Sequence, residues 1–272
     1  MTRIAILAGG GRLPRRLAEA CRDQGHDVHV VGFDGHTDSA TLEGFPHLWV
    51  ALGQAAPVLD WMRSCAVTDV VFFGPLRRPS LTELRPDWRA AAFFAKAGLR
   101  AFGDDGLMRA IARTLETEEG FKVRGAHEFW GAALLGAGPL GTLRPDADAA
   151  VDIERGTAVL RQIGPADVGQ AVVVQQGLVL GVEAIEGTDA LLERCGPLRR
   201  PGPGGVLVKL PKPQQDRRLD LPTIGPVTVE KAAAAGLRGI AAAAGATIAA
   251  DRARLIEAAD RHGLFVVGID AG

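Results

Sequence analysis

The first half of the chain alternates short apolar segments with segments of helical periodicity, and this alternation restricts the possible folds more than any other feature. Apolar runs of strand length occupy residues 3–8, 27–33, 47–52 and 69–73. Apolar side chains recur at helical spacing in 13–24, 58–66 and 107–115. Strands that alternate with helices predict a parallel sheet covered by helices. We therefore expect an α/β protein with a Rossmann-like first domain.

The second half follows a different pattern. A stretch rich in Gly and Pro at 136–145 predicts a linker. A helix is expected over 147–162, and two apolar strands within 170–185 flank a Gln176-Gly177 turn. We therefore predict a Rossmann-like α/β domain over 1–140. A mixed α/β domain over 146–272 would carry most of the polar motifs.

Composition limits the classes of function. The 272 residues are 47% hydrophobic and carry a net charge of −1, which argues against broad electrostatic binding of nucleic acid. The three cysteines are far apart and form no CxxC pair, which is typical of thiols in a reducing compartment. The apolar run near the N-terminus is too short for a signal peptide. We predict a cytoplasmic protein, with contact to a membrane surface left open.

Two loops after strands of the first domain are candidate phosphate-binding segments. GGGRLP at 9–14 precedes a helix, so backbone groups at Gly10, Gly11 and Leu13 could approach a phosphate; the alternative is a tight turn. Pro14 replaces the third glycine of the dinucleotide fingerprint, which argues against a nicotinamide cofactor. Arg78, in GPLRRP at 74–79, could bind phosphate or belong to a solvated loop.

An acidic motif follows the predicted hairpin of the second domain. The segment EAIEGTD at 183–189 contains Glu183, Glu186, Thr188 and Asp189. Three carboxylates and a hydroxyl so close together could ligate a divalent cation or orient water. The alternative is a cap for the helix that begins nearby.

The segment KLPKPQQDRRLDLPTIGPVTVE, at 209–230, combines prolines with charges of both signs. Proline fixes φ and removes a backbone donor, so this segment is neither an ordinary helix nor a central strand. A rigid loop of this kind suits a site that holds a cation and an anion together, as in metal-assisted phosphate chemistry. The alternative is a solvated loop with incidental ion pairs. The candidate side chains are Lys209, Lys212, Gln215, Asp220, Thr223 and Thr228.

Taken together, the motifs resemble the LpxI-type UDP-2,3-diacylglucosamine pyrophosphatases of lipid A biosynthesis. The resemblance runs from LAGGGRLP at 7–14 through GPLRRP at 74–79, GDD at 103–105 and GQAVVV at 169–174. It continues through VEAIEGTDA at 182–190 and KPQQDRRLDLPTIG at 212–225 to the terminal FVVGID. VEAIEGTD and DLPTIG are the most specific of these motifs. Order and spacing match along nearly the whole chain.

The resemblance implies hydrolysis of UDP-2,3-diacylglucosamine to UMP and 2,3-diacylglucosamine 1-phosphate, assisted by Mg²⁺ or Mn²⁺. We expect Asp220, Asp189 and Glu183 to serve catalysis, and Asp220, Asp189 and Glu186 to hold the metal. The substrate-binding set is Gly10, Gly11, Leu13, Arg78, Gln170, Thr188, Lys209, Lys212, Gln215, Thr223 and Thr228. Whether Glu183 or Glu186 is a metal ligand or a general base stays open, as do homodimerisation and transient contact with the inner membrane.

Two other classes of function are compatible with the same residues. A non-enzymatic protein that binds a nucleotide sugar or lipid would use a cleft between the two predicted domains and would tolerate loss of Asp220. A nicotinamide-dependent oxidoreductase would need the glycine pattern that Pro14 interrupts.

Overall fold

The computed structural model describes residues 1–76, 86–97 and 104–270, which form two compact units. The N-terminal unit comprises Met1–Gly131 together with Asp216–Asp220. The C-terminal unit begins at Ala132 and includes the rest of the described chain.

The division between the units lies earlier in the chain than the predicted domain boundary. It falls between Gly131 and Ala132, so residues 132–140 belong to the second unit and not to the first. The Gly- and Pro-rich stretch expected as a linker contains a strand, β6 (Gly138–Leu140), that pairs antiparallel with the last strand of the chain. This pairing joins residues that are distant in sequence, so local composition does not reveal it.

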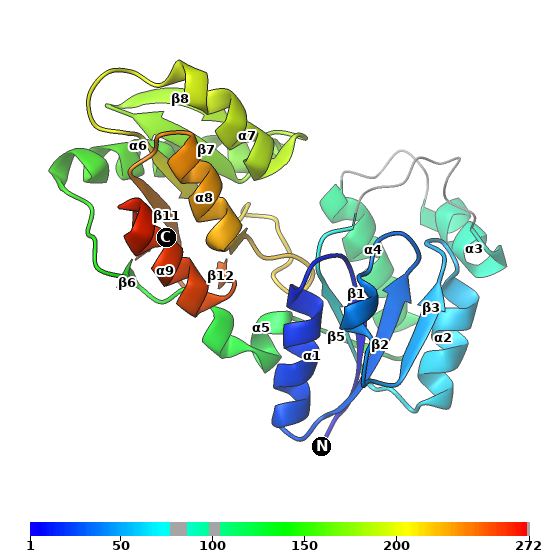
Figure 1. Cartoon of the computed structure of the whole chain (residues 1–272). Helices are drawn as coiled ribbons and strands as arrows, with labels where there is room; N and C mark the ends of the chain where they lie inside the picture. The colour runs from blue at the N-terminus through cyan, green and yellow to red at the C-terminus, as the bar shows by residue number, and fades with distance from the viewer. Residues whose placement is uncertain (77–85, 98–103, 271–272) are drawn as a thin grey trace. The chain divides into compact units, whose positions relative to one another are not determined.

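The N-terminal unit is a parallel sheet of the order β3-β2-β1-β4-β5, which confirms the Rossmann-like prediction (Figure 1). Its strands are β1 (Arg3–Ala8), β2 (Asp27–Phe33), β3 (His47–Val50), β4 (Asp69–Phe73) and β5 (Lys122–Arg124). Its helices are α1 (Leu13–Asp23), α2 (Ala55–Ser64), α3 (Trp88–Ala97), α4 (Asp104–Thr117) and α5 (Ala126–Phe129), with a 3₁₀ turn η1 (Ser39–Thr41).

The two faces of this sheet are covered by different helices. Alternate residues of β1 point to opposite faces, because side chains in a strand have a period of two. Ile4 and Ile6 pack with α1 and α5, whereas Ala5 and Leu7 pack with α2 and α4. The strand order reverses between β1 and β4, and ligands of open α/β sheets bind beyond the carboxyl ends of the strands at such a point.

The C-terminal unit is built on a mixed sheet of the order β6-β13-β11-β9-β7-β8. Its longer strands are β7 (Ala171–Gln175), β8 (Leu178–Val182), β9 (Val206–Lys209), β11 (Gly239–Ala243) and β13 (Phe265–Ile269). The strands β9, β11 and β13 are parallel, and β7 is antiparallel to both β8 and β9. Gln176 and Gly177 have positive φ, so they form the predicted hairpin turn between β7 and β8.

Helices cover both faces of this second sheet. Helix α6 (Ala147–Ile163) packs on one face over β7 and β9. Helices α7 (Gly187–Cys195), α8 (Pro226–Ala234) and α9 (Arg252–His262) pack on the other (Figure 1). A small parallel pair, β10 (Thr223–Ile224) with β12 (Ile248–Ala249), and 3₁₀ turns η2 (Gly131–Ala133), η3 (Gly164–Ala166) and η4 (Gly196–Leu198) complete the elements.

Candidate active site

Three of the predicted site residues meet at one edge of the C-terminal sheet. Strand β9 ends at Lys209, and Lys209 is in register with Ala171 at the start of the antiparallel β7. Val172 is in register with Val182, so β8 ends at the same edge, immediately before Glu183. The topology therefore brings Glu183 and Lys209 together with Gln170, although they come from three separate segments.

Glu183 and Lys209 are linked through the hydroxyl of Thr188. Thr188 Oγ1 donates to Glu183 Oε1 at 2.6 Å and accepts from Lys209 Nζ at 2.9 Å. Lys209 Nζ also donates to the carbonyl oxygen of Thr223 at 3.2 Å. Only 5% of Glu183 and 6% of Lys209 is exposed, so both charges depend on these partners for stabilisation. We call Glu183, Thr188 and Lys209 the sheet-edge network.

Glu183 is also fixed by the chain that precedes β7. The backbone N–H of Gln170 donates to Glu183 Oε2 at 3.0 Å, so both carboxylate oxygens accept hydrogen bonds. Gly169 passes so close to Glu183 that a Cβ there would collide with the Glu183 carbonyl oxygen. Sequence reasoning placed Gly169 in a motif without giving it a role, and its position directly before a buried strand was the available signal.

The side chain of Gln170, next to the sheet-edge network, has an acceptor atom without a hydrogen-bond donor. Its Oε1 atom is buried and has no hydrogen-bond partner within the protein. A buried acceptor without a donor costs about 1–3 kcal/mol, so a ligand or water that donates to it would be stabilised there.

The residues of the proline-rich loop have separate partners. Lys212 pairs with Asp167, and its backbone N–H donates to Gln215 Oε1 at 3.1 Å. Thr228 Oγ1 accepts from Gly225 N at 3.1 Å, which caps helix α8. In this structure Lys212 and Gln215 therefore hold the loop in shape, and Thr228 holds a helix end.

The remaining acids of the EAIEGTD motif do not join the sheet-edge network. Asp189 is exposed and pairs with Lys231 at 3.3 Å. Glu186 accepts from Arg194 at 2.8 Å. The pKa of Glu186 lies below its ordinary value, chiefly because of a backbone hydrogen bond at Glu186 itself and then because of Arg194.

The predicted metal ligands are Asp220, Asp189 and Glu186. Asp189 and Glu186 are each engaged by a different basic side chain, so in this structure they do not form a shared cation site. Asp220 belongs to the N-terminal unit and is exposed. Among the described residues, no three Asp, Glu, His or Cys side chains converge as a metal cage. Mg²⁺ does not need such a cage, because one or two carboxylates usually hold it together with substrate phosphates. A single carboxylate such as Asp220 fits that mode of binding.

In the N-terminal unit, the glycine turn after β1 is locked to the end of β4. Gly9 N donates to Phe73 O and Gly10 N donates to Pro75 O, each at 2.8 Å. Gly11 has a φ of 77°, in the left-handed region that favours glycine. The amides of Gly9 and Gly10 are thus used within the protein. Those of Gly11 and Leu13 lie at the start of α1, where an anion would be favoured. Arg78 lies outside the described residues.

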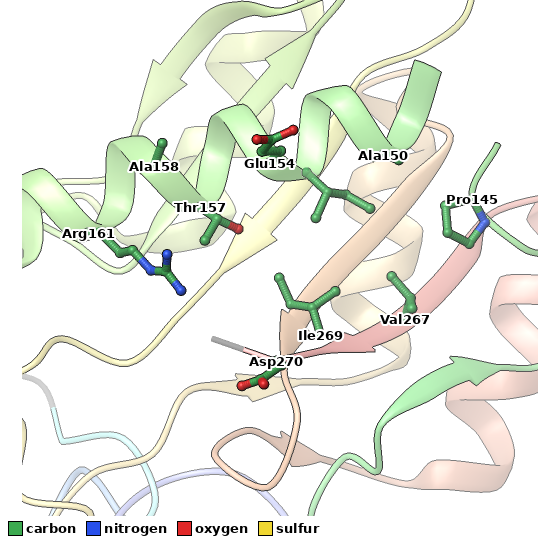
Figure 2. A pocket seen from close by; sticks show the side chains of 10 residues that line it. Pro145, Ala150, Glu154, Thr157, Ala158, Arg161, Val267, Ile269 and Asp270 are labelled. Atoms are coloured by element: carbon green, nitrogen blue, oxygen red, sulfur yellow. The ribbon is translucent and has the colours of Figure 1, made fainter. Parts of the chain in front are cut away.

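A separate groove lies beside helix α6 in the C-terminal unit. Figure 2 shows Thr157 and Arg161 of α6 on one side of it and Val267 and Ile269 of β13 on the other. The groove encloses about 510 Å³. Lys209 and Gly268 both register with Ala242, so the end of β13 is two strands away from Lys209. The groove is therefore near the sheet-edge network but separate from it, and its lining is mostly apolar.

Comparison with known proteins gives matches along both units. The LpxI N-terminal domain model matches residues 3–132, and the LpxI C-terminal domain model matches residues 136–267. The UDP-2,3-diacylglucosamine pyrophosphatase LpxI of Caulobacter vibrioides is 40% identical over 277 aligned positions, covering 99% of this chain and 98% of that protein.

Similarity to solved structures is weak by contrast. The CobK precorrin-6A reductase is 19% identical over 99% of this chain and 88% of its own, with a TM-score of 0.33. The N5-carboxyaminoimidazole ribonucleotide synthetase of Thermotoga maritima is 12% identical over 68% of this chain and 42% of its own, with a TM-score of 0.27. Scores this low establish no shared fold or function.

Proposed function

The chain belongs to the LpxI family, and from that premise we propose that it hydrolyses the pyrophosphate of UDP-2,3-diacylglucosamine. The products are UMP and 2,3-diacylglucosamine 1-phosphate, so the protein is a phosphoanhydride hydrolase of lipid A biosynthesis. The observation that carries this proposal is the full-length match to an LpxI pyrophosphatase.

In this proposal Lys209 attracts the pyrophosphate. Thr188 Oγ1 and Thr223 O hold its ammonium group at a fixed position on the sheet edge. A cation that is fixed before the reaction stabilises developing negative charge without reorganising during the step. Gln170 lies directly before Ala171, the residue in register with Lys209, and its buried Oε1 can accept from a substrate hydroxyl.

Glu183 has a positioning role in this proposal. Both of its carboxylate oxygens already accept hydrogen bonds, from Gln170 N and from Thr188 Oγ1. A group so engaged orients its neighbours more readily than it takes a proton from water. Glu183 therefore fixes the Thr188 hydroxyl, which in turn fixes Lys209.

Asp220 is the proposed anchor for a divalent cation, Mg²⁺ or Mn²⁺. When bound, such a cation neutralises phosphate charge and lowers the pKa of a coordinated water. Asp220 is an exposed residue, and its backbone N–H donates to Asp216 O at 3.1 Å, so its position in the loop is constrained. Asp189 and Glu186 would join only after leaving Lys231 and Arg194.

The location and assembly of the protein are part of the same proposal. We place it in the cytoplasm, with transient contact to the inner membrane where its lipid substrate resides, and as a homodimer. None of the described helices combines the length and the apolar composition that a membrane span requires.

The proposal is tested by phosphorus NMR of the full chain with UDP-2,3-diacylglucosamine. We expect metal-dependent replacement of the pyrophosphate resonances by those of UMP and the sugar 1-phosphate. An unchanged pyrophosphate signal from folded protein with Mg²⁺ or Mn²⁺ would reject hydrolysis. A non-enzymatic binding protein would then be the better reading.

A further inference from the structure

The loop between β9 and β10 starts and ends in the C-terminal unit, but its middle belongs to the N-terminal unit. Residues Asp216–Asp220 are assigned there, whereas Gln215 and Leu221 on either side are not. This segment carries Asp220, the proposed metal anchor. The contacts that hold this segment on the N-terminal unit therefore determine the position of Asp220.

Arg218 ties the segment to helix α4. Its Nε donates to Asp216 Oδ1 at 3.1 Å and its Nη2 donates to Asp216 Oδ2 at 2.7 Å. The other side of the same guanidinium donates through Nη1 to Glu116 Oε1 at 2.8 Å. One planar guanidinium thus joins the start of the segment to α4. Its bidentate hydrogen bonding to Asp216 requires an arginine side chain.

The backbone and an apolar side chain complete the attachment. The N–H groups of Leu219 and Asp220 both donate to Asp216 O, at 2.9 and 3.1 Å, so the segment is a closed turn. The Leu219 side chain packs against the core cluster that includes Leu115 of α4. A Cβ on Gly125 would lie 3.3 Å from Arg218 Cα, so the chain passes close to the unit at this point.

We propose that Arg218 and Glu116 are positioning residues that fix the Asp220 carboxylate on the N-terminal unit. The inference rests on the proposed function only in assigning Asp220 to the reaction. Through Asp216, Arg218 holds the turn whose last residue is Asp220. Glu116 holds Arg218 from outside the segment, so its loss loosens the turn without altering any residue of the loop.

The electrostatics agree with this geometry. The Arg218 hydrogen bonds hold the pKa of Asp216 below its ordinary value, and Asp216 in turn raises the pKa of Arg218. Both groups are therefore charged at neutral pH. A charge-assisted fork between two ionised groups is stronger than a neutral hydrogen bond.

The first test compares Glu116→Ala with Glu116→Gln in the full chain. Glu118→Ala is the matched control, because Glu118 also pairs with an exposed basic residue, Lys96, just beyond the end of α4. We expect kcat for Glu116→Ala to fall about ten-fold, equivalent to about 1.4 kcal/mol, with KM changed less than about two-fold. Glu116→Gln keeps an acceptor oxygen and is expected to lie between Glu116→Ala and the parent chain.

The second test does not depend on activity. Trypsin cleaves after Arg217 and Arg218, so loosening the turn should speed cleavage at these bonds. We expect faster cleavage in Glu116→Ala and in Leu219→Ala, but not in Glu118→Ala. Leu219→Ala loosens the same turn without touching the ion pairs, so it tests the segment even if a Glu116 variant folds poorly.

The outcomes separate this inference from the proposed function. Parent-like cleavage in both Glu116→Ala and Leu219→Ala would overturn the inference, as would parent-like kcat in an active Glu116→Ala. If the parent chain has no pyrophosphatase activity, the proposed function fails. The cleavage rates would still decide whether Glu116 and Arg218 hold the segment.

Discussion

The hydroxyl of Thr188 is the link of the sheet-edge network, and replacing it with a methyl group tests the network directly. Thr188→Val has nearly the same shape as the native side chain. It removes both the donor to Glu183 Oε1 at 2.6 Å and the acceptor for Lys209 Nζ at 2.9 Å. Thr188→Ser keeps the hydroxyl and is the matched control.

The expected loss follows from the two hydrogen bonds. Each involves a charged partner, for which a net contribution of about 1.5–3 kcal/mol is typical. Glu183 keeps its bond from Gln170 N, and Lys209 keeps its bond to Thr223 O, so the lower end of that range applies. We expect the C-terminal unit to lose about 3 kcal/mol in its free energy of unfolding. Mispositioning of Lys209 should lower kcat about a hundred-fold, or about 2.7 kcal/mol.

The distribution of aromatic residues provides a selective assay. All four tryptophans, Trp49, Trp61, Trp88 and Trp130, lie in the N-terminal unit, and the chain has no tyrosine. Tryptophan fluorescence during urea unfolding therefore reports the N-terminal unit, whereas far-UV circular dichroism reports both units. We expect Thr188→Val to move the dichroism transition to lower urea and to move the fluorescence transition less.

Two results would refute this reasoning. The first is a Thr188→Val chain whose dichroism transition and kcat both match those of Thr188→Ser, because the hydroxyl would then contribute neither to stability nor to turnover. The second is an equal loss in both variants, because the effect would then come from the changed shape of the side chain and not from the hydrogen bonds.

Four further predictions follow from individual sites. Asp220→Ala should lower turnover on the order of 10³-fold with unchanged circular dichroism, and near-normal turnover would remove Asp220 from the site. A chelator should abolish turnover and added Mg²⁺ should restore it; activity that survives exhaustive chelation would exclude the metal. Gly169→Ala should lower the free energy of unfolding by about 1–3 kcal/mol, seen by dichroism, because the new Cβ must displace Glu183; an unchanged midpoint would contradict that contact. Burial raises the pKa of the Cys21 thiol from 9.0 to about 12, so stability should fall as pH rises above 9 and the unfolded thiol ionises first. In urea titrations at alkaline pH, the free energy of unfolding of Cys21→Ala should fall less above pH 9 than that of the parent chain. An identical pH dependence in both chains would show that Cys21 is not the cause of the fall.

Local sequence patterns were sufficient for most of the longer elements and for the α/β architecture of the first unit. A buried parallel strand such as β4 is a nearly continuous apolar run, and an amphipathic helix such as α1 repeats with its own period. Both signals are contained within a few residues. The family resemblance likewise depends on short motifs in a fixed order, and the full-length match confirms it.

Strand β6 was not predictable in this way. Three residues of β6 become a strand only through pairing with β13, which is more than a hundred residues further along the chain. A short glycine- and proline-containing segment has no periodicity of its own. The Gly- and Pro-rich composition therefore indicated a linker, although pairing with β13 makes these residues the edge strand of the second sheet.

The sequence by itself determined most of the longer helices and strands, the parallel arrangement of the first sheet, and the polar residues from which a site could be built. The tertiary structure alone decided which of these residues meet. Glu183, Thr188 and Lys209 converge because β7 pairs with both β8 and β9, while Asp189 on the same motif turns toward Lys231. Arg218 donates a hydrogen bond to Glu116, which lies 102 positions earlier in the chain. Periodicity is a property of neighbouring residues, whereas these contacts depend on long-range strand pairing and packing that no local pattern encodes.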